Sequence, residues 1–257
     1  VPLMGVIYIS VAFILTIMHI NLVPGVVGRI FAEAFDFSAI FGGFAGSCMM
    51  FGIKRGLYSN EAGVGSAPNA AAAADVSHPV KQGLVQMLSV FIDTLLICTA
   101  TAFMCLSSGI EPTKELAGAP YVQAALAASM GDYAKLFITV SMVLFAFTTL
   151  LGNLYYVDNA FAYVLKHVPG KTFTLCYRIL ACVLIFIGAG SSMGTMWDLA
   201  DVTMGFMAII NLPVICILGG PALRALDDYT EQRDAGKNPE FKASKIGLTQ
   251  KLDYWQD

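Results

Sequence analysis

The sequence GGFAGSCMMFGIKRGLYSNEAGVGSAPNAAAAAD, residues Gly42–Asp75, contains two features that decide the architecture of the chain. Its first part is apolar like a membrane helix, but it carries a glycine-rich segment at Gly42–Gly46. Its second part turns charged at Lys54 and Arg55 and then alternates small residues with Glu61. Each glycine weakens a helix by about 1 kcal/mol. The first part therefore predicts a broken membrane helix, and the second predicts a structured cytoplasmic loop that packs against helices.

The composition of the whole chain is that of an integral membrane protein. Of the 257 residues, 57% are hydrophobic and 13% are charged, whereas globular domains contain about 25% charged residues. Apolar runs long enough to cross a bilayer recur up to Leu223, and charges are dense from Arg224 onward. We expect an all-α bundle of about six spans in residues 1–223 and a soluble cytoplasmic tail in residues 224–257.

The expected spans follow one another at regular intervals. In order, they are residues 3–20, 38–53, 82–106, 136–165, 173–189 and 198–218, with Gly219–Pro221 ending the last one. Lys and Arg mark the loops Lys54–Lys81 and Lys166–Lys171, which places both on the cytoplasmic side. The chain is therefore predicted to pass several times through the cytoplasmic (inner) membrane of the cell.

A carboxylate inside the third expected span is a candidate functional group. Asp93 lies among apolar residues there, and an ionisable residue inside a membrane is costly. Two interpretations stay open, a functional carboxylate and a hydrogen-bonded structural one. Asp93, and Asp158 in the fourth expected span, are the two candidate groups for binding a proton.

Motifs for several other functions do not occur in the sequence. It contains no glycine-rich phosphate loop, no HExxH sequence and no basic stretch with interleaved aromatic residues. These patterns would be expected of an NTPase, a zinc protease and a nucleic-acid-binding protein. Nothing around Ser66 and His78 supports a hydrolytic pair. We therefore expect neither an enzyme nor a nucleic-acid partner.

A pair of adjacent hydroxyls predicts a sodium site. Sodium is a hard cation that prefers oxygen ligands, and Thr148 and Thr149 offer two hydroxyls halfway along the fourth expected span. The backbone carbonyl of Phe145, one turn earlier, would lie at the same level. The alternative is that each threonine bonds a carbonyl of its own helix, as threonines in helices commonly do.

The glycine-rich break predicts the substrate site. Unwound backbone inside a membrane is tolerated where it lines a cavity, and its freed groups can bind a ligand. Gly42, Gly43 and Gly46 would provide that backbone, and Phe41 and Phe44 would enclose a small apolar side chain. The alternative is that these glycines only allow close helix packing.

Three stretches resemble the alanine/glycine:cation symporter family. They are RGLYSNEAGVGSAP at 55–68, FAFTTLLGNLYY at 145–156 and WDLADVTMGFMAIIN at 197–211. The resemblance covers nearly the whole chain and matches the C-terminal half of a family member. It implies a leucine-transporter-type fold of two inverted repeats, with residues 38–218 forming the second repeat around a broken helix.

The resemblance also implies a function and partners. Thr148, Thr149 and the Phe145 carbonyl match the sodium ligands most widely shared in that fold, and Gly42–Gly46 match its second broken helix. The implied activity is sodium-coupled symport of alanine or glycine by alternating access. A membrane sensor that binds a small neutral amino acid without transporting it remains an alternative. Because the sequence begins at Val1-Pro2 without a Met, we expect a fragment whose N-terminal half is missing.

Overall fold

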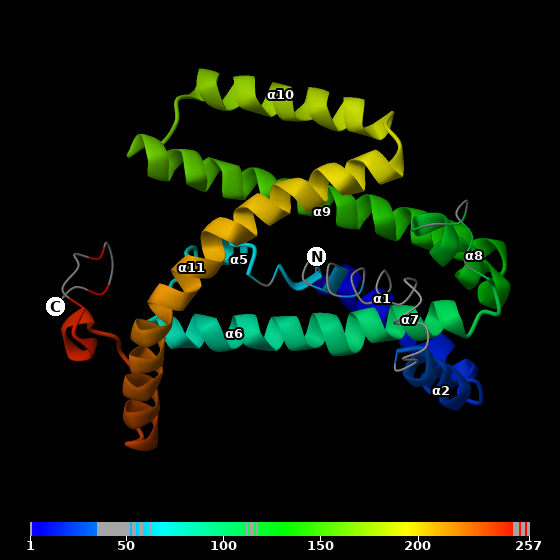
Figure 1. The fold of residues 1–257 in the computed structure, drawn as a ribbon, viewed down its shortest axis with the longest axis horizontal. Helices are drawn as coiled ribbons and strands as arrows, with labels where there is room; N and C mark the ends of the chain where they lie inside the picture. The colour runs from blue at the N-terminus through cyan, green and yellow to red at the C-terminus, as the bar shows by residue number, and fades with distance from the viewer. Residues whose placement is uncertain are drawn as a thin grey trace. The chain divides into compact units, whose positions relative to one another are not determined.

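The computed structural model describes residues 2–34, 52, 55–56, 59–61, 63–111, 113, 116, 118–248, 252 and 255. Within these residues every regular element is a helix and no strand occurs (Figure 1). The predicted all-α class is therefore confirmed for the described part of the chain. The expected span at 38–53, and with it the glycine-rich break, lies outside the described residues.

Four stretches of helix are long and apolar enough to cross a membrane. They are Pro79–Leu106, Asp132–Leu165 (α9), Lys171–Ala189 (α10) and Met193–Asp234 (α11). The first of them consists of α6 (Pro79–Ile92), the π-helix η1 (Asp93–Cys98) and α7 (Thr99–Leu106). α1 (Pro2–Met18) and α2 (Val23–Ala34) form a bent pair with an angle of 98° between the two helices. If this pair is counted as one span, the number of candidate spans among the described residues is five.

The last span differs from the prediction at its C-terminal end. Gly219–Pro221 was expected to end it, but α11 continues through them to Asp234 and is 42 residues long. The prediction was wrong because a proline removes one backbone hydrogen bond and bends a helix without always ending it. Pro213 and Pro221 both lie inside α11. The charged residues from Arg224 onward therefore begin on a helix and not in a loop.

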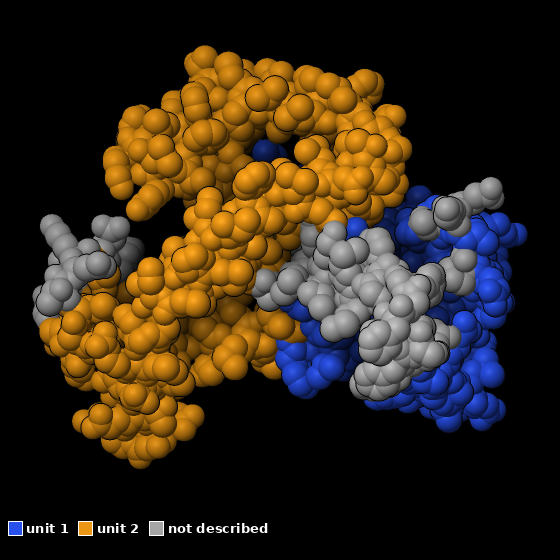
Figure 2. All heavy atoms as spheres, in the orientation of Figure 1, with its two compact units in different colours: residues 1–60, 91–155 blue, residues 61–90, 156–257 orange. Residues whose placement is uncertain are grey.

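The chain divides into two compact units (Figure 2). Unit 1 comprises residues 1–60 and 91–155, and its core lies where α1, α7, α8 (Ala119–Met130) and the start of α9 meet. Ala125 and Leu126 of α8 and Ala134 of α9 are fully buried there. The Tyr8 and Thr101 hydroxyls are hydrogen-bonded at 2.9 Å and link α1 to α7.

Unit 2 comprises residues 61–90 and 156–257 and has a core of its own. The chain folds back after α11 through a short 3₁₀ helix, η2 (Ala243–Ile246), onto the end of α11. Ala225 on α11 and Phe241, Ala243 and Ile246 after it form the buried cluster. The region between Ala67 and Pro79 holds only a five-residue helix, α5 (Ala67–Ala71).

Candidate functional site

The structure brings two of the three predicted sodium ligands together. Thr148 and Phe145 are three residues apart on α9, and the Thr148 hydroxyl donates a hydrogen bond to the Phe145 carbonyl oxygen at 3.0 Å. This is the local bond that threonine commonly forms in a helix. The Phe145 ring packs edge-on against Tyr8 of α1, with 5.9 Å between ring centroids. Phe145 and Thr148 are both partly buried, whereas Thr149 is exposed.

This local geometry is compatible with a hard cation. The Thr148 hydroxyl uses its hydrogen toward Phe145, so its oxygen lone pairs remain able to face a cation. The donor set consists of neutral oxygens, and hard cations such as calcium bind oxygens at about 2.4 Å. A site made from these atoms needs further oxygens from another helix. The proposed substrate residues Phe41, Gly42, Gly43, Phe44 and Gly46 lie outside the described residues.

The glycine-rich loop after Asn60 docks onto the middle of α11. The Asn211 side-chain amide donates to the Gly63 carbonyl oxygen at 3.1 Å. Gly63 and Gly65 have φ angles of +80° and +103°, which side chains rarely adopt. A Cβ on Gly65 would lie 3.0 Å from Cγ of Asn211. The contact confirms the prediction that this loop packs against helices, and it explains why the loop needs glycine at Gly65.

Polar side chains within the loop hold its turn. Ser66 donates to a Glu61 carboxylate oxygen at 2.6 Å, and Glu61 itself has a φ of +50°. Val64 is buried at the tip between the two glycines. Ser66 is bonded to Glu61, whereas His78 faces Asp228. The two side chains thus have different partners. Asn211 was not among the predicted site residues, although its sequence position is a usable signal: it is an amide in an apolar helix, two residues before Pro213.

Asp93, the intramembrane carboxylate, begins the π-helix η1. The Ser59 hydroxyl donates to its Oδ2 atom at 2.6 Å. One residue further along each segment, the Thr94 hydroxyl donates to Oδ1 of Asn60 at 2.9 Å. Ser59 and Asn60 are helical, although a loop was expected from Lys54 onward, and these bonds connect them to the middle of a membrane span within unit 1. Asp93 is therefore a hydrogen-bonded carboxylate.

Asp158, the other candidate proton carrier, is engaged in an ion pair. Arg178 of α10 donates to its Oδ2 atom at 2.8 Å, and both side chains are partly exposed. Phe161 packs edge-on against Phe173 beside the pair, with 5.0 Å between ring centroids. The ion pair thereby joins Asp158 of α9 to Arg178 of α10.

His78, directly before α6, is completely buried in unit 2. Its Nδ1 atom accepts the Val80 N–H at 3.2 Å, so Nε2 carries the hydrogen and faces Asp228 Oδ2 at 3.4 Å. The rings of Tyr229 and Phe241 pack edge-on against it. Burial lowers the pKa of His78 below its usual value of 6.5, against the opposing hydrogen bond and charge of Asp228.

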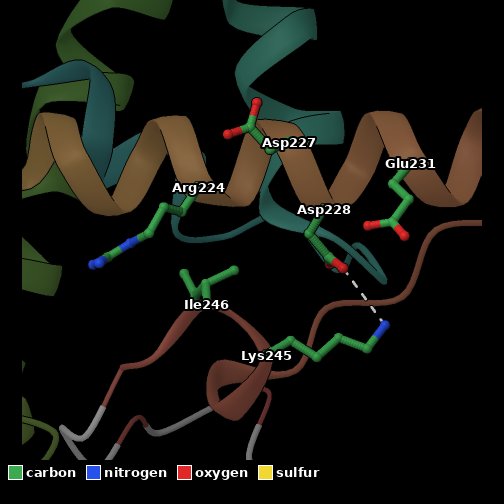
Figure 3. A pocket seen from close by; sticks show the side chains of 6 residues that line it. All are labelled: Arg224, Asp227, Asp228, Glu231, Lys245 and Ile246. Atoms are coloured by element: carbon green, nitrogen blue, oxygen red, sulfur yellow. Dashed lines mark hydrogen bonds and ion pairs between the residues drawn. The ribbon is translucent and has the colours of Figure 1, made fainter.

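An open cleft of about 290 Å³ lies beside this cluster, between α11 and η2 (Figure 3). Its lining carries both signs of charge, from Arg224, Asp227, Asp228 and Glu231 of α11 and from Lys245 of η2. Figure 3 shows Asp228 pointing toward Lys245, whose Nζ atom lies 3.5 Å from its Oδ1 atom. The cleft is thus bridged by the contact that holds the tail to α11, and we assign no ligand to it.

The described part of the chain is therefore that of an integral membrane protein made of long apolar helices with polar groups inside two of them. Comparison with known proteins is consistent with this class. The profile of the sodium:alanine symporter family matches residues 1–243, and the chain belongs to that family. Its members are transporters and not enzymes, so the predictions of family, class and membrane location are confirmed.

Individual relatives match over most of this chain. It is 43% identical to the amino-acid carrier protein AlsT of Bacillus subtilis over 257 residues, which are 100% of this chain and 54% of that protein. It is 39% identical to the sodium/proton-dependent alanine carrier protein of Bacillus sp. strain PS3, covering 100% of this chain and 61% of the relative. It is 38% identical to the sodium/alanine symporter AgcS of Methanococcus maripaludis, covering 91% and 51%. The chain thus spans about half the length of the curated relatives it matches.

Proposed function

We propose that the protein containing this chain is a sodium-coupled symporter of alanine or glycine that works by alternating access in the cytoplasmic membrane. The observation that carries the proposal is the family match over residues 1–243. The names of relatives, which include a sodium/alanine symporter and a sodium/proton-dependent alanine carrier, support this substrate and this ion. Sodium is the coupling ion of this proposal.

The proposal includes a leucine-transporter-type fold. In it, residues 38–218 form the second inverted repeat, and residues 1–223 form the transmembrane bundle. Residues 224–257 are the cytoplasmic C-terminal region. An N-terminal half, the additional length present in the relatives, completes the carrier and supplies the first broken helix. The substrate, a small neutral amino acid, binds at the glycine-rich break formed by Phe41, Gly42, Gly43, Phe44 and Gly46.

In this proposal sodium is bound by the hydroxyls of Thr148 and Thr149 and by the Phe145 carbonyl. The Thr148 hydroxyl and the Phe145 carbonyl lie on adjacent turns of α9 and are now hydrogen-bonded to each other at 3.0 Å, so both oxygens would turn toward a bound ion. Sodium bound there would stabilise the substrate-loaded conformation. The chain's own contribution is to hold these oxygens on α9 at the level of the substrate.

The coupling claim is tested by uptake of labelled alanine into proteoliposomes that hold the full-length protein. An inward sodium gradient should drive uptake, and an equal potassium gradient should not. Equal uptake in both would contradict sodium coupling and favour a proton-driven or facilitative carrier. Binding of alanine without uptake in either would favour a membrane sensor.

The ion site is tested by Thr148→Ala. We expect the sodium concentration that gives half-maximal alanine uptake to rise about tenfold, because one of few oxygen ligands is lost. Thr139→Ala is the matched control, since that hydroxyl also donates to a carbonyl of α9, at 2.8 Å from the Lys135 oxygen. An unchanged sodium requirement in Thr148→Ala, or an equal rise in both variants, would remove Thr148 from the site.

The second candidate function is coupling to protons instead of sodium. The observation that favours it is the carboxylate of Asp93 in the middle of a membrane span. In that case alanine uptake would follow a pH gradient and would be indifferent to sodium.

A further inference from the structure

The proposed sodium ligands Phe145 and Thr148 lie on the face of α9 that packs into unit 1. The buried residues of this helix are Ala134, Ile138 and Ser141. Phe145 and Thr148, both partly buried, continue the same spacing of three or four residues along the helix. A side chain that contacts this face at the level of Phe145 therefore limits how far α9 can turn about its own axis.

Tyr8 of α1 makes such a contact. Its ring packs edge-on against the Phe145 ring, with 5.9 Å between the centroids and 86° between the ring planes. Edge-to-face aromatic pairs at this separation are favourable beyond the area that they bury. Tyr8 is itself partly buried and packs against the core cluster of unit 1. The Phe145 ring therefore meets a neighbour that is held within that core.

The Tyr8 hydroxyl is anchored on α7. Its oxygen lies 2.9 Å from the Thr101 hydroxyl oxygen. The Thr101 hydroxyl donates its one hydrogen to the Ile97 carbonyl oxygen, also at 2.9 Å. In the bond between the two hydroxyls, Tyr8 is therefore the donor and Thr101 the acceptor. Because Ile97 belongs to the π-helix η1, the Tyr8 ring is tied to the irregular part of this span.

Packing alone does not require a hydroxyl at position 8, since a phenylalanine ring would fill the same space. The hydrogen bond adds a preferred direction, because such bonds weaken steeply when they are bent. Tyr8 thus joins a hydrogen-bonded anchor on α7 to the Phe145 side chain on α9.

We propose that Tyr8 is a positioning residue for sodium binding, which orients α9 so that the Phe145 carbonyl and the Thr148 hydroxyl face the ion. The inference rests on the proposed function, because it takes these two groups as sodium ligands. Binding sites hold their groups to within about 0.5 Å. The ligands on α9 need further oxygens from another helix, so the rotation of α9 sets the distance between the two parts of the site. Tyr8 acts through the Phe145 ring, since its hydroxyl is bonded to Thr101.

The test is a sodium titration of the purified full-length protein in lipid nanodiscs without alanine, measured as the rise in melting temperature. Sodium replaces potassium at constant ionic strength, and an ion that binds the folded state stabilises it. Tyr8→Phe removes the donor itself and leaves no buried donor unpaired, so the variant should fold. We expect its sodium dissociation constant to rise about fivefold, which corresponds to one lost hydrogen bond. A lower melting temperature in potassium with an unchanged sodium dissociation constant would indicate a purely structural role and overturn the proposal.

Tyr133→Phe is the matched control, because Tyr133 is 85% exposed near the start of α9. This variant loses the same hydroxyl from the helix that carries the ligands, and its sodium dissociation constant should equal that of the wild type. An equal rise in the two variants would overturn the proposal.

Phe145→Leu tests the route through the Phe145 ring, because it removes the ring and keeps the backbone carbonyl. This variant should also bind sodium more weakly. Adding Tyr8→Phe to it should cause no further loss, since residues that act through one contact have non-additive effects. Additive effects of the two substitutions would show that Tyr8 does not act through Phe145.

Sodium binding and alanine transport are separate readouts. In proteoliposomes, Tyr8→Phe should raise the sodium concentration for half-maximal alanine uptake about fivefold and leave the maximal rate unchanged. A wild-type protein that sodium stabilises but that takes up no alanine would contradict the proposed function, and the titration would still decide the role of Tyr8. A wild-type protein that sodium stabilises no more than potassium does would overturn the sodium site and the role of Tyr8 together.

Discussion

The connection that precedes α6 is held differently at its two ends. Its first end, Glu61–Ser66, is held by the Asn211 amide bonded to the Gly63 carbonyl, by the Ser66–Glu61 bond and by the buried Val64. Its second end, Val76–Lys81, surrounds the fully buried His78. A single net hydrogen bond contributes about 1 kcal/mol. Detaching the first end from α11 therefore breaks fewer of the described contacts than detaching the second end from the C-terminal region.

The second end has many partners from the C-terminal region. The Ser77 hydroxyl donates to the Pro239 carbonyl at 2.9 Å, and the Phe241 N–H donates to the Ser77 carbonyl at 3.0 Å. Lys81 bonds Asn238 at 2.6 Å, and the Trp255 indole donates to the Val76 carbonyl at 3.2 Å. The comparison teaches that, among the described residues, the second end has more hydrogen bonds to distant parts of the chain than the first.

Phe241→Ala should have the largest effect, because it breaks the densely packed end. The ring is 7% exposed and contacts both His78 and Trp255, with centroid distances of 5.1 and 5.7 Å. Removal of a buried Phe costs about 3 kcal/mol, so hydrogen exchange in residues 239–248 should accelerate about 100-fold.

Phe186→Ala is the control for this prediction, since Phe186 is 82% exposed on α10 and should leave exchange in residues 239–248 unchanged. If Phe241→Ala exchanged like this control, the second end would be held no more firmly than the first.

Gly65→Ala should have the next largest effect and act on the first end alone. A side chain at a φ of +103° is strained by about 2 kcal/mol, and the new Cβ would lie 3.0 Å from Asn211. We expect the loop to detach from α11, with about tenfold lower alanine uptake and unchanged hydrogen exchange in residues 239–248.

Gly83→Ala is the matched control, because a Cβ there meets nothing within 4 Å in the interior of α6. Equal uptake by the two variants would show that transport does not require glycine at position 65.

Acidic pH should loosen the second end by a smaller amount. The folded pKa of His78 is lowered below its usual 6.5, mainly by burial, so the unfolded chain binds a proton that the folded chain does not. Stability is complete above 6.5 and falls as the pH drops through the lower folded pKa. Limited proteolysis of residues 239–248 should therefore accelerate between about pH 7.5 and about pH 5.5.

The pH effect should be lost in His78→Gln and retained in His167→Gln, where the histidine is exposed. A pH dependence retained in His78→Gln would assign it to another group.

The sequence predicted local features well and distant pairings poorly. Apolar runs located the spans now seen as α9 and α10 to within four residues at each end, because bilayer thickness requires a run of apolar residues that can be read directly. The end of α11 was missed, since glycine and proline signals are weaker inside an apolar helix. The Thr148–Phe145 bond involves residues three apart and was anticipated as the alternative to ion binding.

Partners far apart along the chain explain what the sequence did not reveal. Asn211 meets Gly63 across 148 residues, and His78 meets Asp228 across 150 residues. No periodicity relates such positions, because their contact depends on how the helices fold together. The sequence placed Asn211 at the end of the motif at 197–211 and gave no sign of its partner Gly63. It likewise gave no sign that His78 would meet Asp228.

The sequence by itself determined the membrane class, the family and the positions of the intramembrane polar residues, because hydrophobicity and local motifs are properties of short stretches. Only the tertiary structure decided which of those polar residues have partners. It paired Asp158 with Arg178 and Asp93 with Ser59. The physical reason is that the partner of a polar side chain inside a membrane comes from another part of the chain: the Arg178 guanidinium meets Asp158, and the Ser59 hydroxyl meets Asp93.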